Sequence, residues 1–426
     1  MTTRRVCAVV LVLAGAAAHA QGIESNYRPY LVGGRAAGMG GAFTALSDDG
    51  SGGYYNPGGL AFVRASSLSF SLNAYGVVGG RVKDALGDGQ DFPYRDLNVF
   101  PVATAGIKKL GETDLETGVA RHTVYFSVFV PDGIYTDDRD QLGESANAYF
   151  SQRSNQTLWI GGGYAYRLGR VGIGAGGYVL IGTTRDFLDL DIILPGGSQF
   201  VILSARDDLS TVGFVGTVGV RWDVTDQLRL GLSFFTPDWG GGSRSSFIRI
   251  GAAVDGNAGA GARQSSDLAA TPSLPYRLQA GVAWEAGSWT LAADLILLGP
   301  RHVHNNPELK SEGLDYLVIR KAVLNVSLGA ELALGGGFSL RTGFFTDFAS
   351  SEPERTDVSN TSHVNHYGFT FSGGLRTDHI RTDVGFTGWW GKGTDVIPKN
   401  LNFSDLARTE AKEYGLFVFL ATAYDF

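Results

Sequence analysis

Residues 322–348, AVLNVSLGAELALGGGFSLRTGFFTDF, contain the pattern that decides the fold. Apolar and polar side chains alternate from Leu324 to Leu334 over ~10 residues, the length that a tilted strand needs to cross a bilayer. Three glycines at positions 335–337 turn the chain, and the alternation resumes from Phe338 to Phe348. The stretch therefore predicts a hairpin with one face in lipid and the other towards a polar interior.

The same alternation recurs along the chain between residues 66 and 426. We expect roughly 14 to 17 strands from this pattern, and because barrels made from a single bacterial chain have even strand numbers, both 14 and 16 fit. Longer connections are expected to alternate with short turns. The long connections are predicted at 132–154, 251–273 and 391–412.

Three features favour a membrane barrel over a soluble β-sandwich, whose strands also alternate. The longer strands exceed the ~5–6 residues typical of globular proteins. The chain ends on an aromatic-rich strand, and its last residue, Phe426, resembles the assembly signal of outer-membrane barrels. Five tryptophans stand near predicted strand ends, where an interfacial girdle belongs. They are Trp222, Trp284, Trp289, Trp389 and Trp390.

The composition supports a strand-rich protein and excludes other classes. Glycine accounts for 61 of the 426 residues and aromatic residues for 12%, whereas charged residues make up only 18%. Disordered chains lack aromatic residues, and glycine costs ~1 kcal/mol at each helix position, which argues against long helices. A net charge of −7 offers no basic surface for nucleic acid, and the single cysteine, Cys7, excludes a disulfide framework.

The first twenty residues are typical of a secretory signal peptide. Two arginines precede an apolar run that ends at an A-x-A cleavage pattern at 18–20, so the mature chain is expected to begin at Gln21. No later run of 18 apolar residues predicts a membrane helix, which leaves an exported β protein. The expected parts are a signal peptide at 1–20, an amino-terminal hatch at 21–64 and a transmembrane barrel at 65–426.

The hatch is predicted because residues 31–61 do not alternate. This stretch is weakly apolar and dense in glycine and alanine. It is too short for a domain and too apolar for a free tail, and small residues allow close backbone packing. We therefore expect it to fold inside the lumen as a plug, and a flexible periplasmic tail is the alternative.

Several stretches of the sequence resemble one known family. Residues 35–43 read RAAGMGGAF, an Asp-Asp pair follows at 48–49, and residues 54–60 read YYNPGGL. Weaker similarity extends to residues 274–278, 289–294 and 340–344. Together these stretches resemble the FadL/TodX family of outer-membrane transporters of long-chain fatty acids and aromatic hydrocarbons.

The resemblance implies an all-β fold, an antiparallel transmembrane β-barrel of about fourteen strands whose lumen is closed by an amino-terminal hatch. It implies an outer-membrane location and hydrophobic substrates that bind near the outer mouth, cross without energy input and leave sideways through the wall. The family's hatch motif maps onto Asn56, Pro57 and Gly58, where Gly58 replaces the usual alanine. Relatives of this signature also occur as secretion-associated barrels, so a barrel that docks a protein partner is the alternative.

Candidate lumen residues follow from the last strand. If Phe426 faces lipid, Phe417 and Phe419 point inward, where they contact an apolar substrate, pack against the hatch, or do both. Inward charges are expected to pair with one another or with water, and an arginine such as Arg341 suits a substrate carboxylate. The predicted inward charges are Arg221, Arg229, Glu285, Asp294, Glu331, Arg341 and Asp347.

No motif predicts catalysis, a cofactor or a metal site. The glycine pattern at 172–177 lies within a predicted strand, whereas the dinucleotide fingerprint requires a turn from a strand into a helix. The histidine pairs at 302/304 and 363/366 stand in expected loops and lack a cluster of acidic or cysteine ligands. We therefore expect that the protein is not an enzyme. The expected partners are long-chain fatty acids or aromatic hydrocarbons, together with outer-membrane lipids, and no nucleic acid is expected to bind.

Overall fold

The computed structural model describes most of the chain beyond residue 24. The predicted signal peptide lies outside the described residues. These are residues 25–28, 30–84, 91–98, 103–113, 120–141, 148–193, 200–240, 243–254, 259–269, 274–304, 317–355, 362–399 and 402–426.

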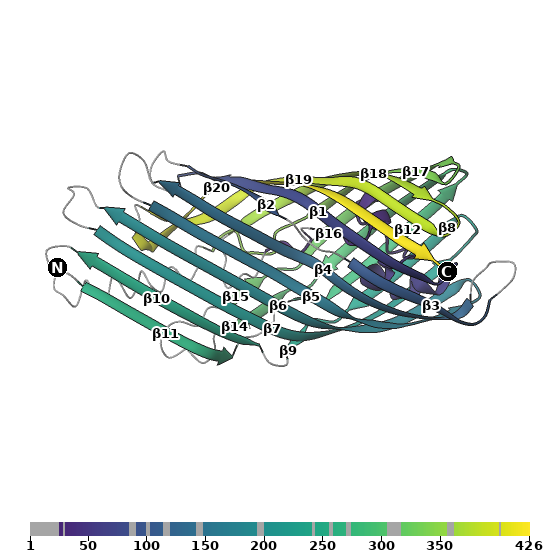
Figure 1. The fold of residues 1–426 in the computed structure, drawn as a ribbon, viewed down its shortest axis with the longest axis horizontal. Helices are drawn as coiled ribbons and strands as arrows, with labels where there is room; N and C mark the ends of the chain where they lie inside the picture. The colour runs from purple at the N-terminus through teal and green to yellow at the C-terminus, as the bar shows by residue number, and fades with distance from the viewer. Residues whose placement is uncertain are drawn as a thin grey trace.

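Fourteen antiparallel strands close into a barrel (Figure 1). The ring closes where the last strand pairs with the first, from Ser67 opposite Asp425 to Val82 opposite Ala411. The expected barrel is confirmed, and the choice between 14 and 16 strands is settled at fourteen. In ring order the strands are β1 (Ser67–Val82), β3 (Ala103–Thr113), β4 (Ala120–Gln141), β5 (Ala148–Leu168), β6 (Val171–Ile193), β7 (Phe200–Asp223), β8 (Leu228–Phe235), β12 (Arg277–Ala286), β13 (Trp289–Leu298), β16 (Val323–Gly335), β17 (Phe338–Asp347), β18 (His363–Arg376), β19 (Ile380–Lys399) and β20 (Asn402–Asp425).

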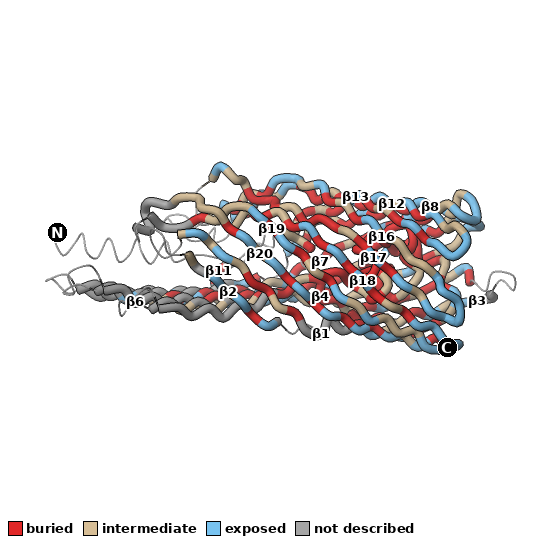
Figure 2. The backbone as a smooth tube through the Cα atoms, turned by 90° about the horizontal axis from the view of Figure 1, so that it is seen from above, coloured by how far each residue is buried: buried red, intermediate tan, exposed pale blue. Residues whose placement is uncertain are grey.

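Burial alternates along the strands, as Figure 2 shows. On β16, Leu324 and Leu328 are about half exposed, whereas Asn325 and Ser327 between them are fully buried. The same side chains that alternate in the sequence thus separate an apolar outer face from a polar inner face. An apolar outer band is what a membrane-spanning wall requires.

Four of the five tryptophans are exposed, as an interfacial girdle requires. The exception is Trp389, which is buried inside the barrel. Its assignment to the girdle is wrong because successive side chains of a strand point to opposite faces, and the neighbouring Trp390 already faces outward.

The two ends of the barrel differ, and we call them the turn end and the loop end. At the turn end, strands are joined by short turns such as 287–288. The carboxyl terminus of the chain lies at this end (Figure 1). Towards the loop end, β4 to β7, β19 and β20 extend to between 20 and 24 residues. The long connections predicted at 132–154, 251–273 and 391–412 are therefore wrong, because strands fill most of each range. Residues 136–141, TDDRDQ, are polar at every position, so the sequence there lacks the alternation that marks a strand.

The strands β14 (Arg301–His304) and β18 contain the four histidines that were predicted to lie in loops. That prediction is wrong, because His302 and His304 lie in β14, and His363 and His366 lie in the first four residues of β18.

Shorter strands complete the sheets. The strand β2 pairs with β1, β9 and β10 pair with β7, β11 pairs with β10, and β14 pairs with β15. Their bounds are β2 (Phe92–Asn98), β9 (Trp239–Gly240), β10 (Arg244–Val254), β11 (Gly259–Ala269), β14 (Arg301–His304) and β15 (Leu317–Arg320).

Helices occur only before β1 in the described part of the chain. They are α2 (Gly34–Gly38), α3 (Gly52–Tyr55) and the 3₁₀-helix η1 (Pro57–Phe62). None of the helices in the described ranges has the length and hydropathy needed to cross a membrane.

Candidate functional site

The described residues between 25 and 64, which we call the amino-terminal segment, lie within the barrel between its walls (Figure 1). Most of their side chains are buried, including Met39, Phe43 and Leu46, none of which is exposed to solvent. Glycines permit the tight course of this segment, because Gly33, Gly40 and Gly41 adopt positive φ angles of 86°, 65° and 75°.

Glycines of the wall allow the segment to approach the strands at backbone distance. A Cβ atom added to Gly343 would lie 2.2 Å from the Gly40 nitrogen, and one added to Gly329 would lie 2.5 Å from the Met39 oxygen. Gly343 and Gly329 are register partners on β17 and β16. Two further register pairs face the segment in the same way. They are Gly174 with Gly219, against residues 56–58, and Gly231 with Gly281, against Thr44.

Wall carboxylates bind backbone amides of the segment. Asp294 on β13 accepts hydrogen bonds from the backbone N–H groups of Phe43 and Thr44, both at 2.8 Å. Asp347 on β17 accepts them from Tyr27 and Arg28, at 3.2 and 2.8 Å. These contacts satisfy amides that would otherwise be buried without partners.

Wall donors bind carbonyl groups of the segment in the same manner. The four donors come from four different strands, so the segment is held from much of the ring. They are Arg221 to Leu46 at 2.6 Å, Ser233 to Tyr55 at 2.7 Å, Arg277 to Tyr54 at 2.7 Å and Thr370 to Gly38 at 2.9 Å.

The predicted hatch motif lies at one of these contact points. Asn56 is fully buried and its side-chain amide donates to the carbonyls of Thr44 and Val220, at 2.8 and 2.9 Å. Its side-chain oxygen accepts from the Gly58 N–H at 2.9 Å, and Pro57 begins η1. An alanine at position 58 would place its Cβ 2.7 Å from the Gly219 oxygen, so glycine fits this wall contact.

An aromatic cluster supports α3 opposite β4, β5 and β6. The ring of Tyr54 packs edge-on against Phe129 and Trp159, with centroid separations of 5.7 and 5.9 Å. The guanidinium of Arg277 lies 4.4 Å from the Tyr54 ring centroid while it binds the Tyr54 carbonyl. Sequence reasoning missed this cluster, because β-strand spacing alone does not identify which inward aromatic residues meet.

Phe417 and Phe419, the predicted lumen residues, both point inward and are 3% and 1% exposed. They belong to a buried apolar cluster with Tyr30, Leu31 and Trp389. The Phe417 ring packs edge-on against Tyr30, 4.9 Å between centroids. The apolar lining therefore includes both wall and amino-terminal residues.

Arg341, the third predicted lumen residue, is buried within a chain of charges. It donates to Glu331 on β16 and, at 2.5 Å, to Asp383 on β19. Arg35 of α2 contacts both oxygens of the same Glu331 at 3.0 Å, and Asp48 at 2.7 Å. In the described ranges, Arg35 is the only residue of the amino-terminal segment that forms an ion pair with the wall.

Asp48 is ionised in this arrangement. Burial alone would raise its pKa, but the adjacent Arg35 and the more distant Arg221 outweigh burial and lower the pKa to about 2. Burial raises the pKa of the neighbouring Asp49, opposed by hydrogen bonds from Ser51. The two neighbouring carboxyl groups therefore have pKa values shifted in opposite directions.

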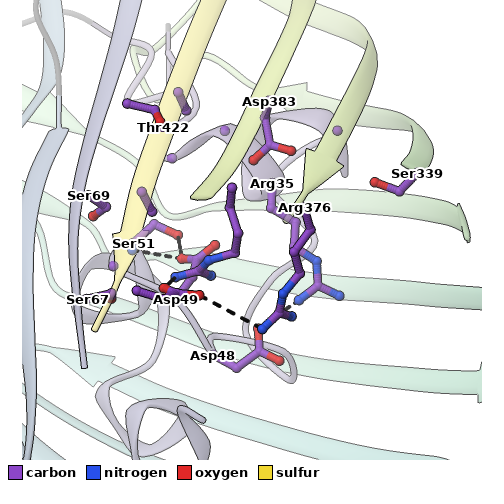
Figure 3. A pocket seen from close by; sticks show the side chains of 18 of the residues that line it. Arg35, Asp48, Asp49, Ser51, Ser67, Ser69, Ser339, Arg376, Asp383 and Thr422 are labelled. Carbon is purple, nitrogen blue, oxygen red and sulfur yellow. Dashed lines mark hydrogen bonds and ion pairs between the residues drawn. The ribbon is translucent and has the colours of Figure 1, made fainter. Parts of the chain in front are cut away.

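A polar cavity of about 430 Å³ lies below the segment at the turn end, and we call it the vestibule. Figure 3 shows charged side chains around it, including Arg35, Asp48 and Asp383. Gly34 and Ala421 both line the vestibule and are in close contact, because a Cβ at Gly34 would lie 2.5 Å from the Ala421 Cβ. Ala421 is two residues from Phe419 of the apolar cluster along β20.

Most of the predicted inward charges have partners in the wall or in the segment. Arg221 pairs with Asp223 at 2.9 Å, and Arg229 pairs with Glu285 at 2.5 Å. Among the described residues, no group of three or more histidine, cysteine or acidic side chains is arranged to hold a metal ion.

No protein-family model matches the sequence, and no curated protein matches it. Solved structures match the fold over nearly the whole chain. A FadL homologue from Pseudomonas aeruginosa is 12% identical with a TM-score of 0.67, covering 94% of this chain and 100% of that one. The toluene transporter TodX from Pseudomonas putida is 15% identical with a TM-score of 0.60, covering 94% and 99%. The monoaromatic hydrocarbon channel CymD is 14% identical with a TM-score of 0.59, covering 93% and 97%.

The fold defines a class: a fourteen-stranded transmembrane β-barrel with its own amino-terminal residues inside the wall. Within that class the chain has the fold of the FadL and TodX channels. The resemblance seen in the sequence is thus confirmed at the level of the fold.

Proposed function

We propose that this barrel lets long-chain fatty acids or other hydrophobic compounds cross the outer membrane by diffusion, with the amino-terminal segment as its hatch. The observation that carries the proposal is the buried apolar cluster of Phe417, Phe419, Tyr30 and Trp389 inside the wall. A general porin needs a polar, water-filled lumen, whereas apolar groups favour apolar solutes by ~0.8 kcal/mol for each CH₂ buried. The solved structures of the same fold include a toluene transporter and a monoaromatic hydrocarbon channel, which supports this class of solute.

In this proposal Phe417 and Phe419 contact the substrate, and Asn56, Pro57 and Gly58 seat the hatch. Arg341 is a weaker candidate for a carboxylate, because Glu331 and Asp383 already occupy its guanidinium. Binding of substrate displaces Tyr30 from Phe417 and shifts the hatch. No cofactor, metal or catalytic residue takes part.

The exit we propose is sideways, through the wall beside β4. Among the described residues, the pairing of β4 with β3 extends to Phe129 opposite Ala103, and the register of β4 with β5 shifts between Phe129 and Asp132. Pro131 lies within that shift and lacks the N–H that a regular ladder needs. The polar vestibule is an unfavourable route for an apolar solute, which supports a lateral exit.

Uptake of a labelled long-chain fatty acid and of labelled toluene tests the proposal. Cells lacking their own transporter carry the full chain, an empty vector, or a variant deleted for residues 21–60 whose insertion is verified. We expect saturable uptake of at least one solute that is altered by the deletion. Uptake of neither solute by an inserted barrel would contradict the proposal and favour the secretion-associated alternative, in which a protein partner copurifies.

A further inference from the structure

We propose that the ion pair between Arg35 and Glu331 is a latch that holds the hatch closed over the vestibule. The inference rests on the proposed function, because it concerns how that hatch is released. It assigns a role to a charge chain that an apolar pathway does not otherwise need: Asp48, Arg35, Glu331, Arg341 and Asp383.

The position of the latch carries the first step. Both oxygens of Glu331 lie 3.0 Å from Arg35, a two-point contact between guanidinium and carboxylate that fixes orientation as well as distance. The side chains of Arg35 and Glu331 are 21% and 14% exposed, so the pair is only partly screened by solvent. Arg341 holds Glu331 from the other side, which leaves the carboxylate facing α2.

The second step is the uneven fixation of the segment. Asp294 and Asp347 hold its backbone on β13 and β17, and Asn56 holds it on β7. On the side of β1, β3 and β20, Lys109 on β3 donates to the carbonyl of Arg64 at 2.6 Å, at the very end of the segment. Beside the vestibule, small groups of the segment contact the wall: Gly34 lies against Ala421 and Gly50 against Ser69.

The third step links the latch to the apolar cluster. Tyr30 packs against Phe417, and Arg35 follows five residues later, after the Gly33 backbone with its positive φ. Displacing Tyr30 from Phe417 therefore pulls on the short stretch that ends at the latch. Once Arg35 leaves Glu331, the roof of the vestibule, residues 33–35 and 48–51, moves into the vestibule and Gly34 separates from Ala421.

Ion current through purified barrels in planar bilayers tests the latch without any hydrophobic solute. The wild-type barrel is expected to open rarely, and the Glu331→Gln variant about tenfold more often. A tenfold change corresponds to ~1.4 kcal/mol in the free-energy difference between the closed and open states. The matched control is Glu285→Gln, which breaks the ion pair with Arg229 between two wall strands beside the same vestibule. Equal opening frequencies for Glu331→Gln and Glu285→Gln would overturn the proposal.

Variants of Arg35 keep the test sound if Glu331→Gln does not assemble, because they leave every strand unchanged. Arg35→Gln is expected to open at least as often as Glu331→Gln, and Arg35→Lys, which keeps the charge and loses the two-point contact, at an intermediate frequency. The double variant of Arg35 and Glu331 should match Arg35→Gln alone, since both changes break the same pair. Additive effects, or wild-type behaviour of both Arg35 variants, would overturn the latch.

The current and the uptake assay separate the two proposals. If wild-type cells take up no hydrophobic solute, the proposed function fails while the comparison of currents still decides the latch. If uptake is present but the Glu331 and Glu285 variants conduct alike, only the latch fails.

Discussion

Asn56 shows how one side chain seats an irregular segment. It joins Thr44, Gly58 and the β7 carbonyl of Val220 without exposing any of its own atoms. Asn56→Ala leaves two buried carbonyl groups without this donor, and each costs ~1–3 kcal/mol in stability. We expect faster hydrogen exchange at amides 40–60 than in the wild type. Exchange in β12 and β13 serves as the internal control, and unchanged protection at 40–60 would show that the motif does not seat the segment.

Asp48 gives the site a defined pH dependence. Its pKa is about 2 in the folded chain against an ordinary 3.8. A lowered folded pKa means that its stabilising contribution is fully present above pH ~4 and is lost as the pH falls towards 2. Asp48→Asn should therefore lower the free energy of unfolding relative to the wild type at pH 7 and pH 5 in lipid vesicles, and the difference should vanish near pH 2. A difference that disappears near pH 6 would assign the effect to another group.

At the scale of elements, the sequence predicted the strands in the half of the barrel near the turn end. It did not predict which wall residues bind the amino-terminal segment. The alternation at 322–348 marks strands because lipid and lumen impose opposite polarity on successive residues. Trp389 was misplaced because two adjacent tryptophans cannot share a face. Asp294 and Asp347 were expected to be inward charges, but their backbone partners could not be found, because amides carry no residue-specific signal.

Paired glycines across adjacent strands make a prediction at this scale. Gly343→Ala on β17 brings a Cβ within 2.2 Å of the Gly40 nitrogen, so the segment or the wall must shift, at ~1–3 kcal/mol. Gly373→Ala on the neighbouring β18 is the control, because a Cβ there meets nothing within 4 Å. We expect proteolysis of the amino-terminal segment only in Gly343→Ala. Equal protection in both variants would show that close backbone approach is not needed.

At the scale of the whole molecule, the outer face of the wall determines insertion. Leu328 on β16 is 47% exposed and lies well inside the strand, whereas Leu334, on the same face, adjoins the turn. Leu328→Arg should destabilise the inserted barrel by ~2–4 kcal/mol and Leu334→Arg by much less, because the cost depends on depth in the bilayer. Denaturant unfolding in lipid vesicles measures both. Equal losses would mean that this face is not in contact with lipid.

The fourteen-stranded ring was foreseen in outline, and its extension beyond the membrane was not. Strands such as β4, with 22 residues, continue past the part where one face meets lipid and into the predicted connection at 132–154. Outside the bilayer nothing forces alternation, so those residues looked like loops. The position of the amino-terminal segment inside the barrel was easier to predict than these strand extensions, because a glycine-dense, weakly apolar stretch needs surrounding structure to be stable.

The account depends most on a hatch that must move, and a reversible disulfide tests that claim directly. Cys7 is the only cysteine and lies in the predicted signal peptide, so Gly50→Cys with Ser69→Cys would give a single disulfide between segment and wall. A Cβ at Gly50 would lie 3.2 Å from the Ser69 Cβ, near the ~3.5–4.5 Å of a disulfide. Uptake of the labelled solute should fall to the empty-vector level when the disulfide forms and recover on reduction, while Ser69→Cys alone stays active in both states. Unchanged uptake with the disulfide verified would contradict the account.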